Sequence, residues 1–317
     1  MLSMATKHLE IVERSNKPSS EDSPPSLFVL DALLQLISIQ CQVNTNGSRR
    51  DEIKANIERM ERICGENGII DGCQLLHSAY TMKSMTLIKD ERVSDALKLL
   101  EETYVNQLKK LRNDKSHPFL EQCISQMALL QKVTQKTEDA IESYTNLAKI
   151  KEHYYGEATE SLVITLKNLG AVQTMANKNE EATATLERAI TIVRKVIDQK
   201  KVKDQKVFNQ HVTEIIFLLQ STFERAGPGQ AIDLAKLNEH EALLKEIYGG
   251  ERSAQFSYFL FLKAKKMMMS EQSNPELTIE TIKRSISILE DIERDSTVKS
   301  SQLGRCYYFQ GTLHQGL

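Results

Sequence analysis

The chain has 317 residues, a length that suits two globular domains or one elongated array of repeats. Its 41 Lys and Arg nearly balance 43 Asp and Glu, so a formal net charge of −2 provides no overall field to attract nucleic acid or acidic membranes. A hydrophobic fraction of 40% excludes a disordered protein, and 13 Gly, 6 Pro and no Trp disfavour an all-β fold.

The first 26 residues are expected to form a short helix and a flexible linker. Residues 1–14 include Lys7 and Glu10 and have no sustained apolar run, so they do not resemble a secretory signal. Three of the six prolines lie in residues 15–26 together with several serines, which is typical of a linker. We therefore place a domain boundary after this linker and a helical repeat domain over residues 27–317.

The repeat domain is expected to begin with a helical hairpin formed by residues 27–43 and 49–64. The most apolar segments of the chain, residues 27–41 and 256–269, are interrupted by charged residues such as Asp31. Neither reaches the roughly 18 uninterrupted apolar residues of a membrane span. We expect no membrane span.

The five cysteines, at positions 41, 64, 73, 123 and 306, contain no C-x-x-C pair. They are expected to be reduced thiols in a cytosol-like compartment, which favours a cytoplasmic protein. Cys64 and Cys73 flank a glycine-containing turn, but no further Cys or His completes a zinc site at finger spacing. We expect neither a metal nor a cofactor.

A repeat of 42 residues runs through the middle of the chain. Its clearest unit joins two amphipathic segments, residues 160–176 and 180–196, by a turn so short that the segments must be antiparallel neighbours. Small residues at two repeat positions allow close helix crossing, and large residues fill the space between hairpins. The paired positions are Ile124 with Leu166, Met127 with Leu169, Ala128 with Gly170, Ala140 with Ala182, Tyr144 with Leu186 and Leu147 with Ala189.

The same pattern recurs upstream and downstream and predicts five hairpins besides the N-terminal one. It includes Ser84 upstream, and Leu219 and Ala264 downstream. A further helix over residues 298–313 is expected to cap the array. The interval from Gly170 to Leu219 is 49 residues rather than 42, and we place the additional residues at 200–206 as a protruding helical turn, a hypothetical docking element.

The pattern small-x12-Ala-x3-large-x2-Ala in short helix-turn-helix units resembles the tetratricopeptide repeat (TPR). The 42-residue period narrows the resemblance to the long repeats of the kinesin light chain group. The resemblance covers residues 116–200 most clearly and extends over residues 70–294. The segments that carry it are His117-Pro118 at the start of a first helix, Leu166 to Gly170 (LKNLG), Glu187 to Ile190 (ERAI) and Tyr154 to Glu157 (YYGE).

The resemblance implies an all-α fold, a right-handed α-α superhelix of about six hairpins with a C-terminal capping helix. The first helices of its hairpins would line a groove for a peptide or helix of a partner protein. Asn168 occupies a position where such repeats present an amide to a bound backbone, and a bond to a neighbouring helix is the alternative. By repeat position, the groove-facing residues are Ser125, Leu129, Lys132, Lys167, Asn168, Ala171, Thr174, Ile216, Gln220, Phe223, Phe261, Lys265 and Met268.

Motifs for other functions are incomplete. Lys167 is followed four residues later by Ala171, so the Lys and Asn pair with which related repeats grip a C-terminal carboxylate is missing. The His240-Glu241 pair lacks the second His of a zinc protease motif, and the glycines of residues 226–230 lack the Lys-Ser/Thr of a phosphate loop. The basic residues 194–206 contain no aromatic side chains for stacking on nucleic acid bases.

The sequence therefore predicts a non-catalytic scaffold or adaptor for a protein or peptide partner, with no nucleic acid bound and its oligomeric state left open. The alternative is a structural or regulatory subunit of a larger stable complex, organellar or linked to a cytoskeletal motor, whose faces are permanently buried. A soluble monomer or dimer in size-exclusion chromatography would favour the adaptor. An enzyme would require convergent carboxylates or histidines that the repeat frame does not explain.

Overall fold

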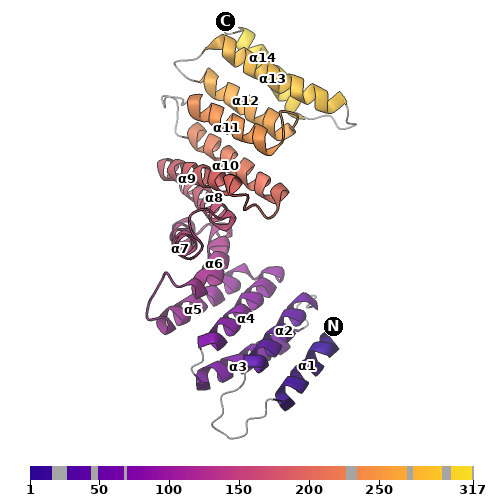
Figure 1. Ribbon diagram of the computed structural model, residues 1–317, viewed down its shortest axis with the longest axis vertical. Helices are drawn as coiled ribbons and strands as arrows, with labels where there is room; N and C mark the ends of the chain where they lie inside the picture. The colour runs from indigo at the N-terminus through magenta and orange to yellow at the C-terminus, as the bar shows by residue number, and fades with distance from the viewer. Residues whose placement is uncertain are drawn as a thin grey trace. The chain divides into compact units, whose positions relative to one another are not determined.

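The computed structural model describes residues 1–15, 27–43, 49–67, 70–225, 234–269, 274–294 and 301–315 (Figure 1). Within these ranges the regular structure consists of 14 α-helices and one short 3₁₀ helix, without a β-strand. The chain divides into two compact units, residues 1–156 and 157–317. Residues 16–26 of the predicted linker lie outside the described ranges, and the domain boundary after residue 26 stays a prediction.

Unit 1 begins with three helices that share one core and continues with two hairpins. Helix α1 buries Leu9 against α2, and the same core contains Leu33, Ile57 and Met60. Helices α4 and α5 form the next hairpin, and α6 and α7 form the one after it. The bounds are α1 (Leu2–Ser15), α2 (Leu27–Val43), α3 (Arg50–Asn67), α4 (Ile70–Lys89), α5 (Val93–Lys110), the 3₁₀ helix η1 (Pro118–Leu120), α6 (Glu121–Val133) and α7 (Thr137–Tyr155).

Unit 2 contains three further hairpins and the C-terminal helix. Helices α8 and α9 pack closely, as do α12 and α13, and α14 packs on α13. Its bounds are α8 (Glu160–Met175), α9 (Asn179–Asp198), α10 (Gln205–Arg225), α11 (Leu234–Ile247), α12 (Ala254–Met268), α13 (Pro275–Arg294) and α14 (Ser301–Gln315). The predicted succession of five hairpins, the N-terminal pair of helices and the final helix is confirmed.

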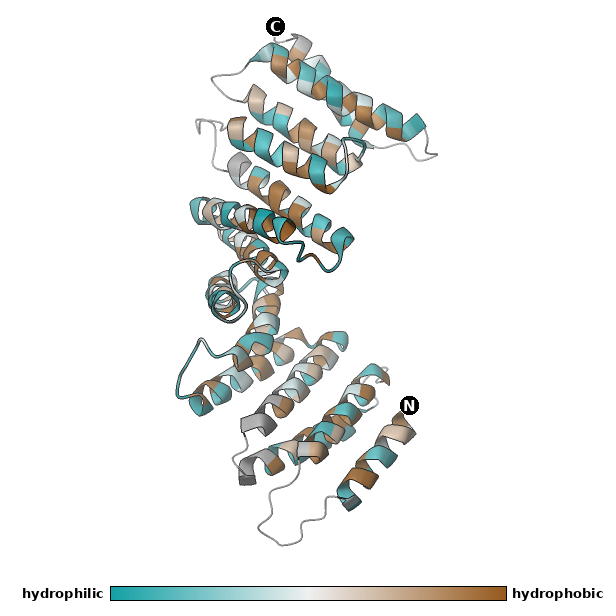
Figure 2. Cartoon of the chain, in the orientation of Figure 1, coloured by the Kyte–Doolittle hydropathy of each residue, from teal (hydrophilic) through white to brown (hydrophobic). Residues whose placement is uncertain are grey.

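The helices begin and end at residues whose chemistry suits helix termini. Thr159 and Ser253 each accept a hydrogen bond from a backbone N–H three residues later, at the start of α8 and α12. After α6 and α8 the chain turns at Gln135 and Asn177, both with a φ of 60°. The N–H of the following residue then bonds back to a carbonyl of the last turn, which closes the helix end. Figure 2 shows that the helices carry both hydrophobic and hydrophilic residues.

The protruding turn predicted at residues 200–206 is wrong. Helix α9 ends at Asp198, residues 201–204 are irregular, and α10 already begins at Gln205. The Asp204 carboxylate accepts a hydrogen bond from the Val207 N–H at 3.1 Å and caps this start. Most of the additional length therefore extends α10, because α10 has 21 residues and α8 has 16.

Helices α8 and α9 cross closely at Gly170, as the sequence predicts. A Cβ atom placed on Gly170 would lie 2.5 Å from Cγ of Leu186, which is itself fully buried. Gly170→Ala is therefore expected to lower the free energy of unfolding by about 1–3 kcal/mol, because the packed core has no room for the methyl group. Chemical denaturation followed by circular dichroism measures the change.

The matched control for this substitution is Gly304→Ala on α14, where an added Cβ meets no atom within 4 Å. That substitution is expected to stabilise the helix by about 0.5–1 kcal/mol, because Ala loses less backbone entropy than Gly. Equal effects of the two substitutions would contradict the close crossing at Gly170.

Candidate functional site

In unit 1 the first helices of two hairpins, α4 and α6, expose large apolar side chains. Met85 is 52% exposed on α4, and Leu129 and Val133 are 50% and 63% exposed on α6. Helices α4 and α6 are in contact, and the Ser84 hydroxyl donates to the amide oxygen of Gln126 at 3.0 Å between them. We define the A face of unit 1 as Met85, Ile88, Ser125, Leu129, Lys132 and Val133.

Three of these six residues were predicted from repeat position. Ser125 and Leu129 are exposed, whereas Lys132 is half-buried and engaged in contacts of its own. Met85, Ile88 and Val133 were missed, although apolar residues one helical turn from a predicted groove residue were a usable signal. A cluster of exposed large apolar residues on adjacent helices is the kind of surface that proteins cover with a partner.

In unit 2 the first helices carry a polar cluster at the corresponding place. The Lys167 side chain is 12% exposed, and its Nζ lies 2.5 Å from Oε2 of Glu214 and 3.0 Å from Nδ1 of His211. Burial disfavours the charge of Glu214, but hydrogen bonds from Lys167 and Gln210, with the nearby positive charges, outweigh it and lower the pKa of this carboxyl. Lys167 thus joins α8 to α10 and is not free to grip a ligand.

Asn168 and Ala171 lie beside this cluster on α8, and both are half-buried. The Asn168 side chain makes no hydrogen bond to any of the described residues. Its amide can therefore both donate and accept at the surface of unit 2.

An aromatic row continues from α10 across α12 to α14. The rings of Phe217 and Tyr258 meet edge to face at 5.2 Å, and those of Tyr258 and Phe261 lie nearly parallel at 6.3 Å. Phe261 in turn meets Phe309 edge to face at 5.6 Å. We define the A face of unit 2 as the half-buried and exposed residues Asn168, Ala171, Phe217, Tyr258, Phe261, Lys265 and Met268.

Three predicted groove residues are corrected, because their side chains are in the interior. Ile216 is fully buried, Gln220 is nearly so, and Thr174 is buried with its hydroxyl donating to the Gly170 carbonyl. The burial pattern of α10 aligns Gln220 with Gly170, and these residues are 50 positions apart. The predicted interval of 49 residues, from Gly170 to Leu219, was therefore wrong by one residue. One residue turns a helical side chain by 100°, which moved the prediction into the core and away from Phe217. The side chain of Phe223, also predicted, lies outside the described residues.

The buried amide of Gln220 has no hydrogen-bond partner for its nitrogen or its oxygen. Gln220→Leu is expected to raise the free energy of unfolding by about 1–3 kcal/mol, because an unpaired buried polar group is replaced by an apolar one of similar size. Urea denaturation of the two proteins tests this. A loss of stability would show that the amide is satisfied in solution.

Within the described ranges, no group of three or more His, Cys, Asp or Glu could hold a metal ion. None of the helices in those ranges combines the length and the apolar character that a membrane span requires.

The fold that these hairpins define is an all-α superhelix of TPR-like repeats. No protein-family model and no curated protein sequence matches the chain. Among solved structures, BtubC (BKLC) from P. vanneervenii matches with a TM-score of 0.56 and 17% identity, over 78% of this chain and 89% of that one. This likeness shows the fold.

Two structures of a Podosopora anserina putative kinesin light chain with nearly identical TPR-like repeats match with lower scores. One has a TM-score of 0.46 and 14% identity over 71% of this chain and 96% of its own. The other has a TM-score of 0.42 and 14% identity over 78% of this chain and 95% of its own. The chain is thus an all-α protein of TPR-like fold.

Proposed function

We propose that the protein is a non-catalytic scaffold or adaptor of the cytoplasm that binds a segment of a partner protein on its A faces. The observation that supports this most is the exposure of Met85, Leu129 and Val133 on two adjacent first helices. Removing such side chains from water contributes about 1.5–3 kcal/mol each when a partner covers them fully. A TPR-like fold suits this role, because its first helices present a row of side chains on one surface.

Unit 2 supplies a different chemistry for the same role. The open amide of Asn168 suits the backbone of an extended peptide, and the aromatic row offers flat apolar area beside it. Each A face would then bind its own portion of a partner, with apolar contacts on unit 1 and backbone hydrogen bonds with aromatic contacts on unit 2.

The test is quantitative affinity purification with matched variants. Leu129→Lys and Asn168→Ala each alter one A face, and Val105→Lys is the control, because Val105 is similarly exposed but belongs to the second helix α5. We expect Leu129→Lys to reduce recovery of the partner about tenfold or more and the control to leave it unchanged. Equal recovery with all three variants would rule out the A faces as the binding surface.

The oligomeric behaviour of the purified chain separates this proposal from a permanent subunit. A soluble monomer or dimer in size-exclusion chromatography is expected for an adaptor. Insolubility that only co-expressed partners relieve would instead indicate a subunit whose A faces are always covered.

A further inference from the structure

Two lysines, Lys83 in unit 1 and Lys263 in unit 2, occupy the same position of the repeat. Each precedes a small residue, Ser84 or Ala264, which is fully buried where two helices cross. Each also lies on the first helix of a hairpin, flanked by the second helix of the preceding hairpin and the second helix of its own. Their surroundings can therefore be compared residue by residue within each unit.

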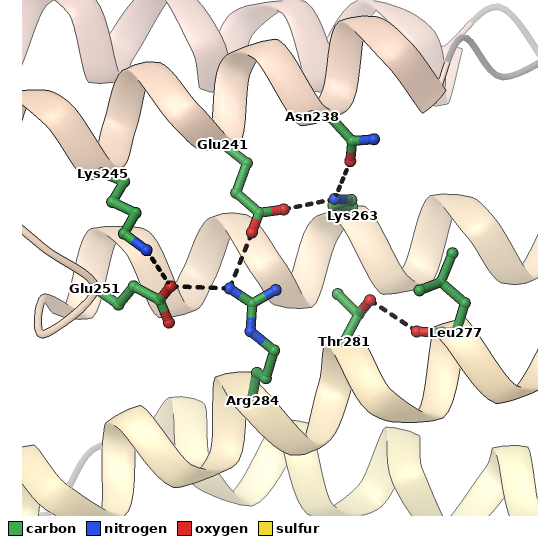
Figure 3. A network of polar contacts seen from close by, with 8 residues as sticks. All are labelled: Asn238, Glu241, Lys245, Glu251, Lys263, Leu277, Thr281 and Arg284. Atoms are coloured by element: carbon green, nitrogen blue, oxygen red, sulfur yellow. Dashed lines mark hydrogen bonds and ion pairs between the residues drawn. The ribbon is translucent and has the colours of Figure 1, made fainter.

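In unit 2 this position is closed by a network of charges from three helices (Figure 3). Nζ of Lys263 lies 2.5 Å from Oε2 of Glu241 and 2.7 Å from Oδ1 of Asn238, both on α11. The other oxygen of Glu241 lies 3.0 Å from Arg284 on α13. The lysine of α12 thus has a carboxylate partner, and that carboxylate is bound from the opposite side by an arginine.

In unit 1 the same position is open. Lys83 makes no hydrogen bond or ion pair with any described residue, and the carboxyl of Glu61 on α3, on which its charge acts, does not approach within ion-pair distance. Glu102 of α5 stands where α13 has Arg284, so the charge that would complete the bridge is reversed. Between α3, α4 and α5 the structure has a cleft of about 490 Å³ lined in part by Lys83 and Glu102.

The charges of this cleft are mixed and balanced. Its basic residues are Lys54, Lys83, Arg92 and Lys98, and its acidic residues are Asp51, Asp90, Asp95 and Glu102. Equal numbers of both signs do not suit a polyanion such as nucleic acid, which is bound by surfaces of predominantly positive charge. Two local pairs lie among these residues, Arg92 with Asp95 at 2.6 Å and Lys98 with Glu102 at 4.0 Å, and both are exposed pairs that a ligand can replace. The lining therefore suits a ligand that itself carries both signs in close succession.

The cleft is separate from the A face of unit 1. Met85 and Ile88 lie about 200° and 140° around α4 from Lys83, because successive residues of a helix are 100° apart. Leu87 and Asp90 line the cleft together with Lys83. They lie one and two turns after Lys83 on the same side of α4. A partner on the A face would therefore leave this cleft accessible.

We propose that the cleft between α3, α4 and α5 is a second binding site, for a polypeptide segment that carries acidic and basic side chains about one helical turn apart. Its carboxylate pairs with Lys83, as Glu241 does with Lys263, and its basic group pairs with Glu102. The ligand supplies the bridge that α11 and α13 provide in unit 2. The volume is in the range of about 300–1,000 Å³ that is usual for ligand sites and accommodates a few side chains.

The experiment measures fluorescence anisotropy of labelled peptides of about 15 residues built from Glu-Ala-Ala-Ala-Lys units, with the full chain as receptor. Reference peptides replace all Glu by Gln, all Lys by Gln, or both. We expect saturable binding of the mixed peptide and at least tenfold weaker binding of the three references. Equal or tighter binding of a singly charged peptide, or no binding of the mixed one, would overturn the proposal.

Variants locate the site. Lys83→Met is expected to weaken binding of the mixed peptide about tenfold, Lys83→Arg to retain it, and Lys149→Met, at an exposed lysine of α7, to leave it unchanged. Glu102→Arg is expected to abolish binding, because it reverses the charge that pairs with the basic group of the peptide. Binding that survives both Lys83→Met and Glu102→Arg would place the peptide elsewhere. Leu129→Lys on the A face should leave peptide affinity unchanged, so this result is independent of the proposed scaffold function.

Discussion

Glu241→Gln is expected to lower the free energy of unfolding by about 3 kcal/mol, because it leaves the charge of Lys263 without a carboxylate. The Lys263 side chain is 8% exposed and Glu241 is 16% exposed, so water cannot replace the lost partner. The variant also removes the ion pair between Glu241 and Arg284, which is more exposed and contributes less. Chemical denaturation of the purified variant measures the loss.

The control for this prediction is an ion pair on the surface. Lys98 and Glu102 of α5 are 4.0 Å apart, and both side chains are more than half exposed. Glu102→Gln is therefore expected to change stability by less than about 0.5 kcal/mol. A loss of under about 1 kcal/mol for Glu241→Gln would show that Lys263 is solvated or neutral in the folded protein.

Acidification is expected to destabilise unit 2 through His240 on α11. The pKa of this histidine is lowered from 6.5 to about 4, mainly by burial. Glu187 opposes this shift, and the positive charges of Lys266, Arg194 and Lys236 add to it. Between these two pKa values the unfolded chain binds a proton that the folded protein does not. The contribution of neutral His240 to stability is therefore fully present above pH 6.5. It is lost as the pH falls to 4, about 3 kcal/mol in total.

The measurement is urea denaturation at a series of pH values for the protein and for His240→Leu. Carboxyl groups titrate in the same range, so the informative quantity is the difference in the free energy of unfolding between the two proteins. The free energy of unfolding of the unchanged protein is expected to fall relative to that of His240→Leu as the pH falls from 7 to 4. Parallel stability curves over this range would mean that His240 has the same pKa in the folded and unfolded chain.

The helices and their pairing could be predicted from the sequence because both depend on residues close together in the chain. The apolar periodicity of residues 160–196 and the short turn at Asn177 require an antiparallel hairpin. The close crossing at Gly170 followed from its small size at a repeat position, and the fully buried Leu186 opposite confirms it.

The candidate site was predicted in part. Ser125 and Leu129 lie on an exposed face as expected, because the repeat of 42 residues is unbroken around α6 and α8. In α10 the longer repeat shifted the frame by one residue, and the prediction selected the buried Ile216 in place of Phe217. A helical wheel cannot correct this error, since neighbouring helices decide which of two adjacent apolar residues is covered.

The sequence by itself thus determined the all-α class, the succession of hairpins and the near-neutral charge, since composition and periodicity are local properties. Only the tertiary structure decided that Lys263 pairs with Glu241, which also binds Arg284, while Lys83, at the same repeat position, faces an open cleft. The two lysines precede equivalent small residues. Their surroundings differ because of side chains on the two flanking helices, about twenty residues away in the chain. The physical reason is that the energy of a charge in a protein depends on partners brought near by packing, and not on its neighbours in sequence.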